Sequence, residues 1–399
     1  MLAFLYLHAS GQCFSLPQAL TYDQGPDLKE RDRKIENCIS FTLSKSYLKI
    51  LHDTSGKKIR LPVKWLVING DTLAPATIST RGKSTLHFSR KSFCVSIGRK
   101  AGFIHGEKTD SLKKFCLLSL SMDKYYHNNR LAYEMMKNCR LFDLYYTFCD
   151  VRINGKSEGI YMIVERPEEW AMKKKKSPVV IRRGYNEEIE KIGSKHGISK
   201  EEIARIRNSY QEIYRVLNRF QGEDLYRSVS NLLDLDAYMK WIAFNFLVRN
   251  GDYTDEVYFY YDPVSCRFKI IPWDYDDLFM LSPHEGKETN KAALAGKLIF
   301  SAEDLLDKKI VEDKYLYRVY LLNFRKVLLA LSDDKLKGIF ENTFAELYPY
   351  YLDNEIIGMS KYDIYPDATV EKLRQDLLSF YDIIKRQRDF YFNYLTNAK

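Results

Sequence analysis

The chain has 399 residues, 45% of them hydrophobic and 29% charged, so it can bury a substantial core as one two-lobed unit or as two domains. Its formal net charge of +9 favours acidic partners, but no nucleic-acid recognition motif accompanies that charge, which argues against a nucleic-acid-binding protein. The seven cysteines include no CxxC pair, which argues against a zinc site and against an obligatory disulfide scaffold.

Residues 1–35 are expected to form a leader and a linker. The apolar run at residues 2–7 is too short to span a bilayer, and no later segment qualifies as transmembrane. The run is typical of the tail of a signal peptide or of a lipoprotein leader with Cys13 as the acylated residue, and a disordered N-terminus is the alternative. We therefore expect an exported protein that is periplasmic, extracellular or lipid-anchored to the envelope, although a cytoplasmic location stays open.

Short strands separated by turns are predicted for the next part of the chain. They are Cys38–Thr42, Tyr47–His52, Ile59–Ile68, Thr77–Thr80 and Lys91–Ile97. A polar loop, Arg81–Thr85, precedes the last strand, in which the period of two places Lys91, Phe93 and Val95 on one face. A lysine at the head of an apolar face requires an anion, either a carboxylate or a phosphate, unless it lies at an edge and reaches solvent.

A helix is predicted over Asp123–Cys139, with Asn128 as its cap and Glu134 one turn after Arg130. A hairpin then pairs Tyr145–Ile153 with Gly159–Glu165 through the Asn154-Gly155 turn. The rest is predicted to be mainly helical. Its segments are a solvated loop at Lys173–Lys176, charged helices over Asn186–Leu232 with a break at Gly197, an apolar core helix at Asp234–Val248, and helices at Asp313–Leu331, Asp334–Tyr348 and Thr369–Leu395.

A second hairpin follows the apolar helix and concentrates acidic residues. Glu256–Tyr261 and Arg267–Ile271 read as strands around the turn at Asp262–Ser265, which sets Asp252 roughly opposite Asp274 and within about 10 Å of it. The open end of this hairpin gathers Asp252, Asp255, Glu256, Asp274, Asp276 and Asp277. Because carboxylates repel one another, the cluster indicates a hard divalent metal with oxygen ligands, and a solvated acidic end is the alternative.

The order of these parts is also that of protein kinases, in which a catalytic-loop Asp, a strand, a turn and a second strand precede a metal-binding Asp. Asp252 takes the first place in this plan and Asp274 the second.

Several motifs in a fixed order are characteristic of one protein family. They are Arg81-Gly82-Lys83-Ser84 with Lys91, Asp123 with Asn129-Arg130-Leu131-Ala132, Asn154-Gly155 to Gly159-Ile160-Tyr161 with Glu165, Asn250-Gly251-Asp252, and Tyr258–Tyr261 leading to Ile271–Asp276. Over residues 60–280 the chain resembles the spore-coat protein H (CotH) kinase family of atypical kinase-like proteins. The resemblance implies an α+β, two-lobed atypical protein-kinase-like fold. We expect a β-rich nucleotide-binding lobe over residues 36–185 and a mainly helical lobe over 186–399 that carries the catalytic hairpin 250–277.

The resemblance implies ATP-dependent phosphorylation of a protein acceptor, of the Ser/Thr type, with Mg²⁺ or Mn²⁺. Matched motif by motif, the roles are as follows: Lys91 holds the phosphates, Arg81 and Ser84 belong to the phosphate-side loop, either Glu134 or Glu165 pairs with Lys91, Asp252 is the catalytic base, and Asp274 is the principal metal ligand.

One departure from the family stands at Glu256, where an asparagine is expected. Glu256 is then either a carboxylate metal ligand, with Asp255 as the fallback, or the mark of an altered or inactive site. The alternatives to a protein kinase are a catalytically weak pseudokinase that acts in adhesion or in envelope or coat assembly, and ATP-dependent transfer to a glycan or small molecule.

Overall fold

The computed structural model describes residues 8–9, 12–13, 25–30, 33–184, 187–284 and 294–397. The apolar run at residues 2–7 and the side chain of Cys13 lie outside this part of the chain. Strands β1 (His8–Ala9) and β2 (Gln12–Cys13) pair only with each other. Within the described ranges, no helix combines the length and the apolar character that crossing a membrane requires.

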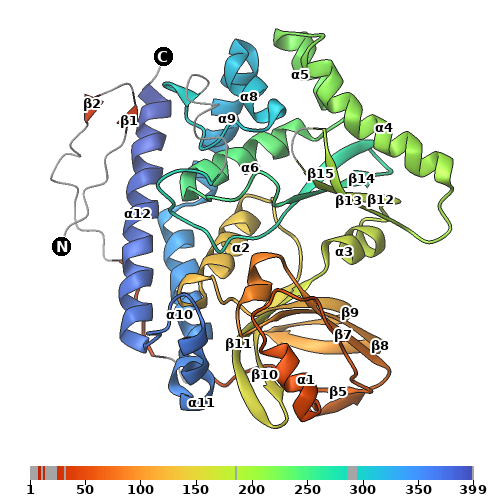
Figure 1. Ribbon diagram of the computed structural model, residues 1–399. Helices are drawn as coiled ribbons and strands as arrows, with labels where there is room; N and C mark the ends of the chain where they lie inside the picture. Colours follow the sequence, from red (N-terminus) through yellow and green to blue (C-terminus); the bar gives the residue numbers. More distant parts are fainter. Residues whose placement is uncertain are drawn as a thin grey trace.

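A large mixed sheet forms the N-terminal part of the molecule (Figure 1). Its strands, in spatial order, are β4 (Arg60–Leu61), β7 (Ala76–Arg81), β8 (Ser92–His105), β9 (Lys108–Leu118), β11 (Lys156–Glu165), β10 (Tyr146–Ile153), β3 (Cys38–Phe41), β5 (Leu66–Ile68) and β6 (Asp71–Leu73). Adjacent strands are antiparallel except for β10 and β3, which are parallel. This sheet encloses a small core of its own, to which Phe93, Val95 and Ile97 of β8 contribute.

A second sheet carries the predicted catalytic hairpin. Its strands, in order, are β13 (Ile189–Ser194), β12 (Val179–Arg183), β14 (Val257–Asp262) and β15 (Arg267–Pro272). The hairpin of β14 and β15 is therefore confirmed. The lobe boundary at residue 185 stays a prediction, although β12 pairs with β14 and so belongs with the second sheet.

Helices make up most of the remaining structure. They are α1 (Lys45–Leu51), α2 (Asn128–Asn138), α3 (Pro167–Lys174), α4 (Lys200–Leu217), α5 (Gly222–Ser230), α6 (Leu235–Val248), α8 (Leu305–Glu312), α9 (Lys314–Ala330), α10 (Asp333–Leu352), α11 (Asn354–Ile357) and α12 (Val370–Asn397), with 3₁₀ turns η1 (Ser84–His87), η2 (Lys124–Tyr126) and η3 (Gly358–Tyr362). Figure 1 places the N-terminal sheet at one end, the second sheet with α4 and α5 at the other, and α12 along one side. The predicted α+β class is confirmed, as are the C-terminal helices.

Several predicted elements differ from the structure. Lys173 and Lys174, expected in a loop, end helix α3, and the single strand expected at Ile59–Ile68 is the two short strands β4 and β5. The strand expected at Tyr47–His52 is helix α1, because Ser44 caps it by accepting a hydrogen bond from the Tyr47 amide and only Leu51 of the helix is buried. The stretch expected to be helical from Asn186 contains β13, which pairs along the whole of β12. Because β12 pairs with the distant strand β14 on its other side, pairing within the sheet overrides local propensity here.

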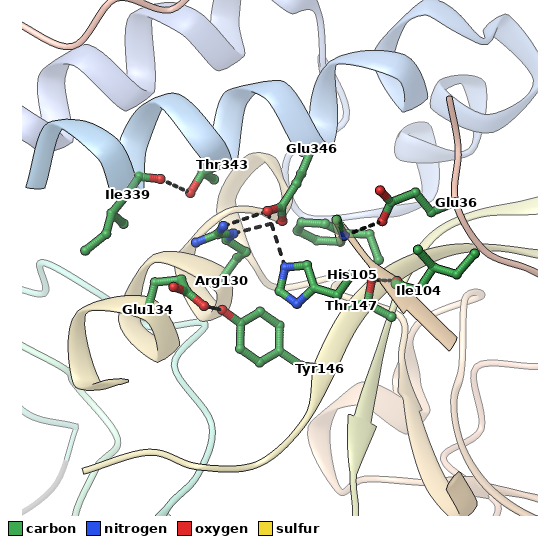
Figure 2. Close-up of polar contacts among 12 residues, drawn as sticks. Glu36, Ile104, His105, Arg130, Glu134, Tyr146, Thr147, Ile339, Thr343 and Glu346 are labelled. Carbon is green, nitrogen blue, oxygen red and sulfur yellow. Dashed lines mark hydrogen bonds and ion pairs between the residues drawn. The ribbon is translucent and has the colours of Figure 1, made fainter. Parts of the chain in front are cut away.

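Helix α2 lies between the N-terminal sheet and the C-terminal helices, and ion pairs fix its position (Figure 2). The Arg130 guanidinium donates two hydrogen bonds, of 2.7 and 3.0 Å, to the Glu346 carboxylate on α10. His105, at the end of β8, contacts the same carboxylate at 3.3 Å, and Glu134 accepts a hydrogen bond from the Tyr146 hydroxyl. These buried contacts hold the N-terminal end of α2 in place beside the acidic hairpin.

Candidate active site

Helix α6 delivers the first acidic residue of the hairpin. The helix is almost entirely buried and ends at Arg249, which takes the left-handed conformation with φ of 49°. Asn250, only 1% exposed, then accepts a hydrogen bond from the Asp252 amide at 3.2 Å and donates one to the Asp274 carbonyl at 3.4 Å. One buried amide therefore ties the Asp252 turn to the Asp274 segment.

The register of the hairpin differs from the prediction by three residues. Val257 pairs with Pro272, so the continued register places Asp255 rather than Asp252 across from Asp274. The hairpin loop is centred later than predicted, because Asp262 and Arg267 are still paired. Asp252 nevertheless joins the cluster through the turn that precedes β14, because one of its oxygens lies within 4.8 Å of oxygens of Asp255 and Glu256.

Three carboxylates at the open end of the hairpin lie within reach of one ion. Oxygen atoms of Asp252, Asp255 and Glu256 all lie within 4.8 Å of one another. Two of these residues, Glu256 and Asp255, are predicted metal ligands, and the third is the predicted base. Glu256 keeps one buried oxygen, Oε2, without a hydrogen-bond partner. An all-oxygen donor set with an unsatisfied carboxylate oxygen suits Mg²⁺ or Mn²⁺.

Asp274 occupies a strained position beside this cluster. Its φ of 54° is uncommon for a residue other than glycine, and such strain is frequent at functional sites. Asn129 accepts a hydrogen bond from the Tyr275 amide at 2.9 Å, and Asn128 donates one to the Asp276 carbonyl at 2.7 Å. The first turn of α2 therefore helps to hold the Asp274 backbone in this conformation.

The prediction that Asn128 caps α2 is wrong, since Asn128 is the first residue of the helix. Instead, the buried Asp123 carboxylate accepts hydrogen bonds from the Asn128 amide at 2.7 Å and the Asn129 amide at 2.9 Å. Asp123 also accepts a bond from the Asn129 side chain, which orients the Asn129 oxygen toward Tyr275. The carboxylate thus supports the Asp274 segment through Asn129.

Arg81, at the end of β7, supplies a positive charge next to Asp274. Its guanidinium lies 5.2 Å from the centre of the Trp273 ring, and its Nη1 is buried without a hydrogen-bond partner. Burial raises the pKa of Asp274, while the charges of Arg81 and Arg182 oppose that rise. A buried, unsatisfied guanidinium nitrogen beside a carboxylate is suited to bind an anion such as a phosphate.

A chain of ion pairs crosses from the Arg81–Ser84 loop to the hairpin. Lys83 lies 2.9 Å from Glu190 of β13, Arg182 of β12 lies 2.9 Å from the same carboxylate, and Arg182 also lies 2.7 Å from Glu256. Arg182 was not among the predicted site residues, because β12 was not predicted as a strand of this sheet. The only signal was the apolar run before it, Val179–Ile181.

The pKa values of the acidic residues show how crowded the cluster is. Restricted hydration raises the pKa of Asp252 to about 6, and the charges of Asp255 and Asp274 add to the rise. Burial also raises the pKa of Glu256 well above its ordinary value, against the opposing charge of Arg182. The cluster therefore disfavours its fully ionised form unless a cation is added.

Lys91 directly precedes β8, and the contacts of its side chain lie away from this cluster. Phe93 and Val95 of β8 pack into the small core of the N-terminal sheet. The Lys91 ammonium donates hydrogen bonds to the carbonyls of Asp53 at 2.8 Å, of Leu86 at 2.6 Å, and of Phe88. Three backbone carbonyl oxygens therefore contact the Lys91 ammonium in place of the anion that was predicted.

The two glutamates expected to pair with Lys91 have other partners. Glu134 lies 2.9 Å from Lys137, and Glu165 lies 2.9 Å from Lys174. The predicted Lys91–glutamate pair is therefore absent among these described residues. Ser84 is exposed at the start of η1, on the loop that follows Arg81.

A histidine not singled out in the sequence also lies at the cluster. His284 forms an ion pair with Asp277, and its amide donates a 3.0 Å hydrogen bond to the Gly251 carbonyl. Its charge lowers the pKa of Asp252 and so opposes the carboxylates around it. Asp274, Asp276 and Asp277 do not belong to the group of carboxylate oxygens within 4.8 Å.

Comparison with known proteins places these residues in a family. The model of the family described as CotH kinase protein matches residues 78–376. The inner spore coat protein H of Bacillus subtilis (strain 168) is 20% identical over 319 residues, which cover 74% of this chain and 84% of that protein. A solved complex of HipA, HipB and operator DNA from Shewanella oneidensis MR-1 aligns with a TM-score of 0.30 and 12% identity, over 84% of this chain and 67% of that chain.

The family match begins before Arg81 and ends after the acidic hairpin, so it includes every residue of the cluster described above. It covers well over half of the chain and agrees with the family that the sequence motifs indicate. The chain belongs to the CotH kinase protein family.

Proposed function

We propose that this protein is an ATP-dependent kinase that transfers the γ-phosphoryl group to a protein acceptor with the help of a divalent metal. One observation carries the proposal. Oxygen atoms of Asp252, Asp255 and Glu256 lie within 4.8 Å of one another, and the charge of the half-buried Arg81 acts on the strained Asp274. Phosphoryl transfer depends on positioning and charge neutralisation, which such a group of residues can provide.

Asp274, Glu256 and Asp255 are the proposed ligands of Mg²⁺ or Mn²⁺. The unpartnered Oε2 of Glu256 and the shared group of oxygens support Glu256 and Asp255, and Asp274 is proposed because its charge acts on Glu256. The metal, when bound, would neutralise charge on the phosphates of ATP. Glu256 stands where the family has a neutral asparagine, so the site carries one more negative charge than expected, and Arg182 offsets part of it.

Arg81 is the proposed phosphate ligand, with Ser84 on the loop that follows it. Arg81 Nη1 is buried and has no partner, whereas Lys91 would reach a phosphate only after losing three hydrogen bonds to carbonyls. Lys83 and Arg182 add positive charge on the same side, held by Glu190. In this proposal a guanidinium takes the part that kinases usually give to a lysine.

Asp252 is the proposed catalytic base. Its side chain is exposed at the mouth of the cluster, and its pKa of about 6 allows it to be ionised at neutral pH and still to accept a proton. It would take the proton of an acceptor hydroxyl, a serine or threonine in the proposed substrate, as that oxygen attacks the γ-phosphorus.

The test is transfer of label from γ-labelled ATP to the protein itself and to proteins of the envelope fraction, with Mg²⁺ or Mn²⁺ and with a chelator. The parent should label protein only with metal present, and Asp252→Asn should reduce the rate by about 10² to 10⁴, the usual worth of a general base. Labelling that persists in both Asp252→Asn and Asp274→Asn would contradict these assignments.

A second candidate is a catalytically weak protein that acts in adhesion or in assembly of an envelope or coat. Arg182 already pairs with Glu256 at 2.7 Å, which favours this candidate, and the relative from Bacillus subtilis is named as a spore coat protein. An exported or coat-associated location is proposed on the same ground. Failure to bind ATP with any divalent metal would favour this second function.

A further inference from the structure

Two cysteines face each other across neighbouring strands of the N-terminal sheet. The register pairs Cys94 of β8 directly with Cys116 of β9. Cys94 is half-buried, whereas Cys116 is 4% exposed, and both are free thiols. The pair therefore has one half-buried and one buried member.

The alternation of β8 places this pair on the side of the candidate active site. Phe93 and Val95 point into the small core of the sheet, so Cys94 between them points to the other face. Arg81 pairs with Ser92, two residues before Cys94, and therefore shares the face of Cys94. The two thiols and the proposed phosphate ligand thus lie on the same surface of the sheet.

The geometry of the pair is compatible with a disulfide. Directly opposed residues on antiparallel strands have Cα atoms about 4.5 or 5.5 Å apart. Disulfides accept Cα separations of about 4.4 to 6.8 Å, so either arrangement allows the bond without separation of the strands.

The surroundings make Cys94 the reactive partner. The neighbouring Cys116 thiol lowers the pKa of Cys94 to about 6, the charges of Arg81 and Arg166 lower it further, and burial and Glu168 oppose the change. The pKa of Cys116 is raised well above its ordinary value. A thiolate is the nucleophilic form of cysteine, so one member of the pair is activated and the other is a thiol ready to resolve the product.

A second pair of neighbouring cysteines provides a contrast within the same sheet. Cys38 and Cys149 lie on the adjacent parallel strands β3 and β10, where Cys38 pairs with Asp150. Burial and the charge of Asp150 raise the pKa of both thiols. A cation, Arg152, also lies beside Cys38, but burial and Asp150 outweigh its effect there, whereas the pKa of Cys94 is lowered overall.

We propose that Cys94 and Cys116 form a reversible oxidative modification site on the active-site face of the N-terminal sheet, with a peroxide as the oxidant. The Cys94 thiolate attacks one peroxide oxygen, which gives a sulfenic acid and, for hydrogen peroxide, one water. The Cys116 sulfur then attacks the Cys94 sulfur, which forms the disulfide and releases a second water. The two thiols are oxidised, the peroxide is reduced to two waters, and a dithiol reverses the reaction by exchange.

Oxidation also changes the charge next to Arg81. The Cys94 thiolate competes with a phosphate for that guanidinium, and the disulfide is neutral. On this ground, which rests on the proposed function, the oxidised protein binds ATP more tightly by about two- to fivefold, the usual size of one partly exposed charge pair.

The experiment treats the folded full chain with a small excess of hydrogen peroxide, alkylates the remaining thiols, and identifies linked peptides by mass spectrometry. The proposal expects a Cys94–Cys116 disulfide that a dithiol reverses, with Cys38 and Cys149 alkylated. Cys116→Ser should leave a sulfenic acid at Cys94 that a 1,3-diketone traps, and Cys94→Ser should leave Cys116 alkylated only after unfolding. Recovery of Cys94 and Cys116 as free thiols while the exposed Cys266 is oxidised would overturn the proposal.

A titration with ATP and metal, before and after oxidation, tests the effect on Arg81. Tighter binding after oxidation supports it, and unchanged or weaker binding refutes it. Absence of ATP binding in both forms would refute the proposed kinase function, whereas the disulfide is judged by mass spectrometry alone.

Discussion

Replacing Glu256 with glutamine separates a metal ligand from a purely structural ion-pair partner. Glu256 Oε1 accepts a hydrogen bond from Arg182 at 2.7 Å, and Oε2 is buried without a partner. Glutamine keeps the size of the side chain and an acceptor for Arg182, but it removes one negative charge from the cluster. The variant therefore changes the charge of the site and retains most of its contacts.

The size of the effect follows from the spacing of the carboxylates. At the 4.8 Å limit of the group, two unit charges repel by about 0.9 kcal/mol in water and by about 3.5 kcal/mol at an effective dielectric constant of about 20. Asp252 and Asp255 both act on Glu256, and Arg182 offsets part of their effect. We expect Glu256→Gln to relieve about 1 to 3 kcal/mol of repulsion in the metal-free protein.

The assay is thermal unfolding of the parent and the variant in a chelator and across a titration of Mg²⁺ or Mn²⁺. In the chelator, Glu256→Gln should unfold at the same temperature as the parent or a higher one. The metal concentration that gives half of the stabilisation should rise at least about tenfold, a loss usual even for groups that only support a ligand.

Glu190→Gln is the matched control, because Glu190 also pairs with Arg182 but does not belong to the group within 4.8 Å. It should leave the metal titration unchanged. The reasoning is refuted if Glu256→Gln destabilises the protein in chelator and its metal response overlaps that of the parent, since Glu256 would then serve only as a partner of Arg182.

Three further predictions concern the other site residues. Asp274→Asn should abolish metal-dependent binding of ATP, measured by calorimetry, and unchanged metal dependence would exclude Asp274 as a ligand. Arg81→Met should weaken the binding of ATP far more than the binding of adenosine. Lys91→Met, which loses three hydrogen bonds, should lower the free energy of unfolding by about 2 to 4 kcal/mol and affect the binding of both ligands alike. The reverse pattern would assign the phosphate to Lys91. Since the pKa of Asp252 rises from 3.8 to about 6 on folding, its protonated form is favoured in the native state, so the metal-free parent should lose stability as pH increases from about 4 to about 6. Urea unfolding should show that loss in the parent and a smaller one in Asp252→Asn, and equal pH profiles would count against the raised pKa.

The sequence predicted the acidic hairpin because its signals are local. Aromatic and β-branched residues around the Asp262–Ser265 turn specify two paired strands, and α6 is apolar enough to be recognised as a core helix. The register could not be fixed to the residue, because the length of the loop depends on pairs near the turn, such as Asp262 with Arg267. Because of that shift, Asp255 rather than the predicted Asp252 lies opposite Asp274.

The partners of the site came from long-range contacts and could not be predicted. Arg182 reaches Glu256 only because β12 pairs with β14, about eighty residues further along the chain. The place of Lys91 could not be predicted, because alternation along a strand does not say which face of the sheet meets the active site. The Lys91 ammonium donates hydrogen bonds to backbone carbonyls instead of pairing with an anion, and such contacts leave no pattern in the sequence.

Calorimetric titration of the protein with ATP, in the presence and absence of Mg²⁺ or Mn²⁺, tests the central claim most directly, because the acidic cluster repels a triphosphate unless a cation is present. We predict that ATP binds with metal, that a chelator abolishes this binding, and that Asp274→Asn cannot be saturated under the same conditions. Binding of ATP that is equally strong in chelator, or equally strong in Asp274→Asn, would contradict the account.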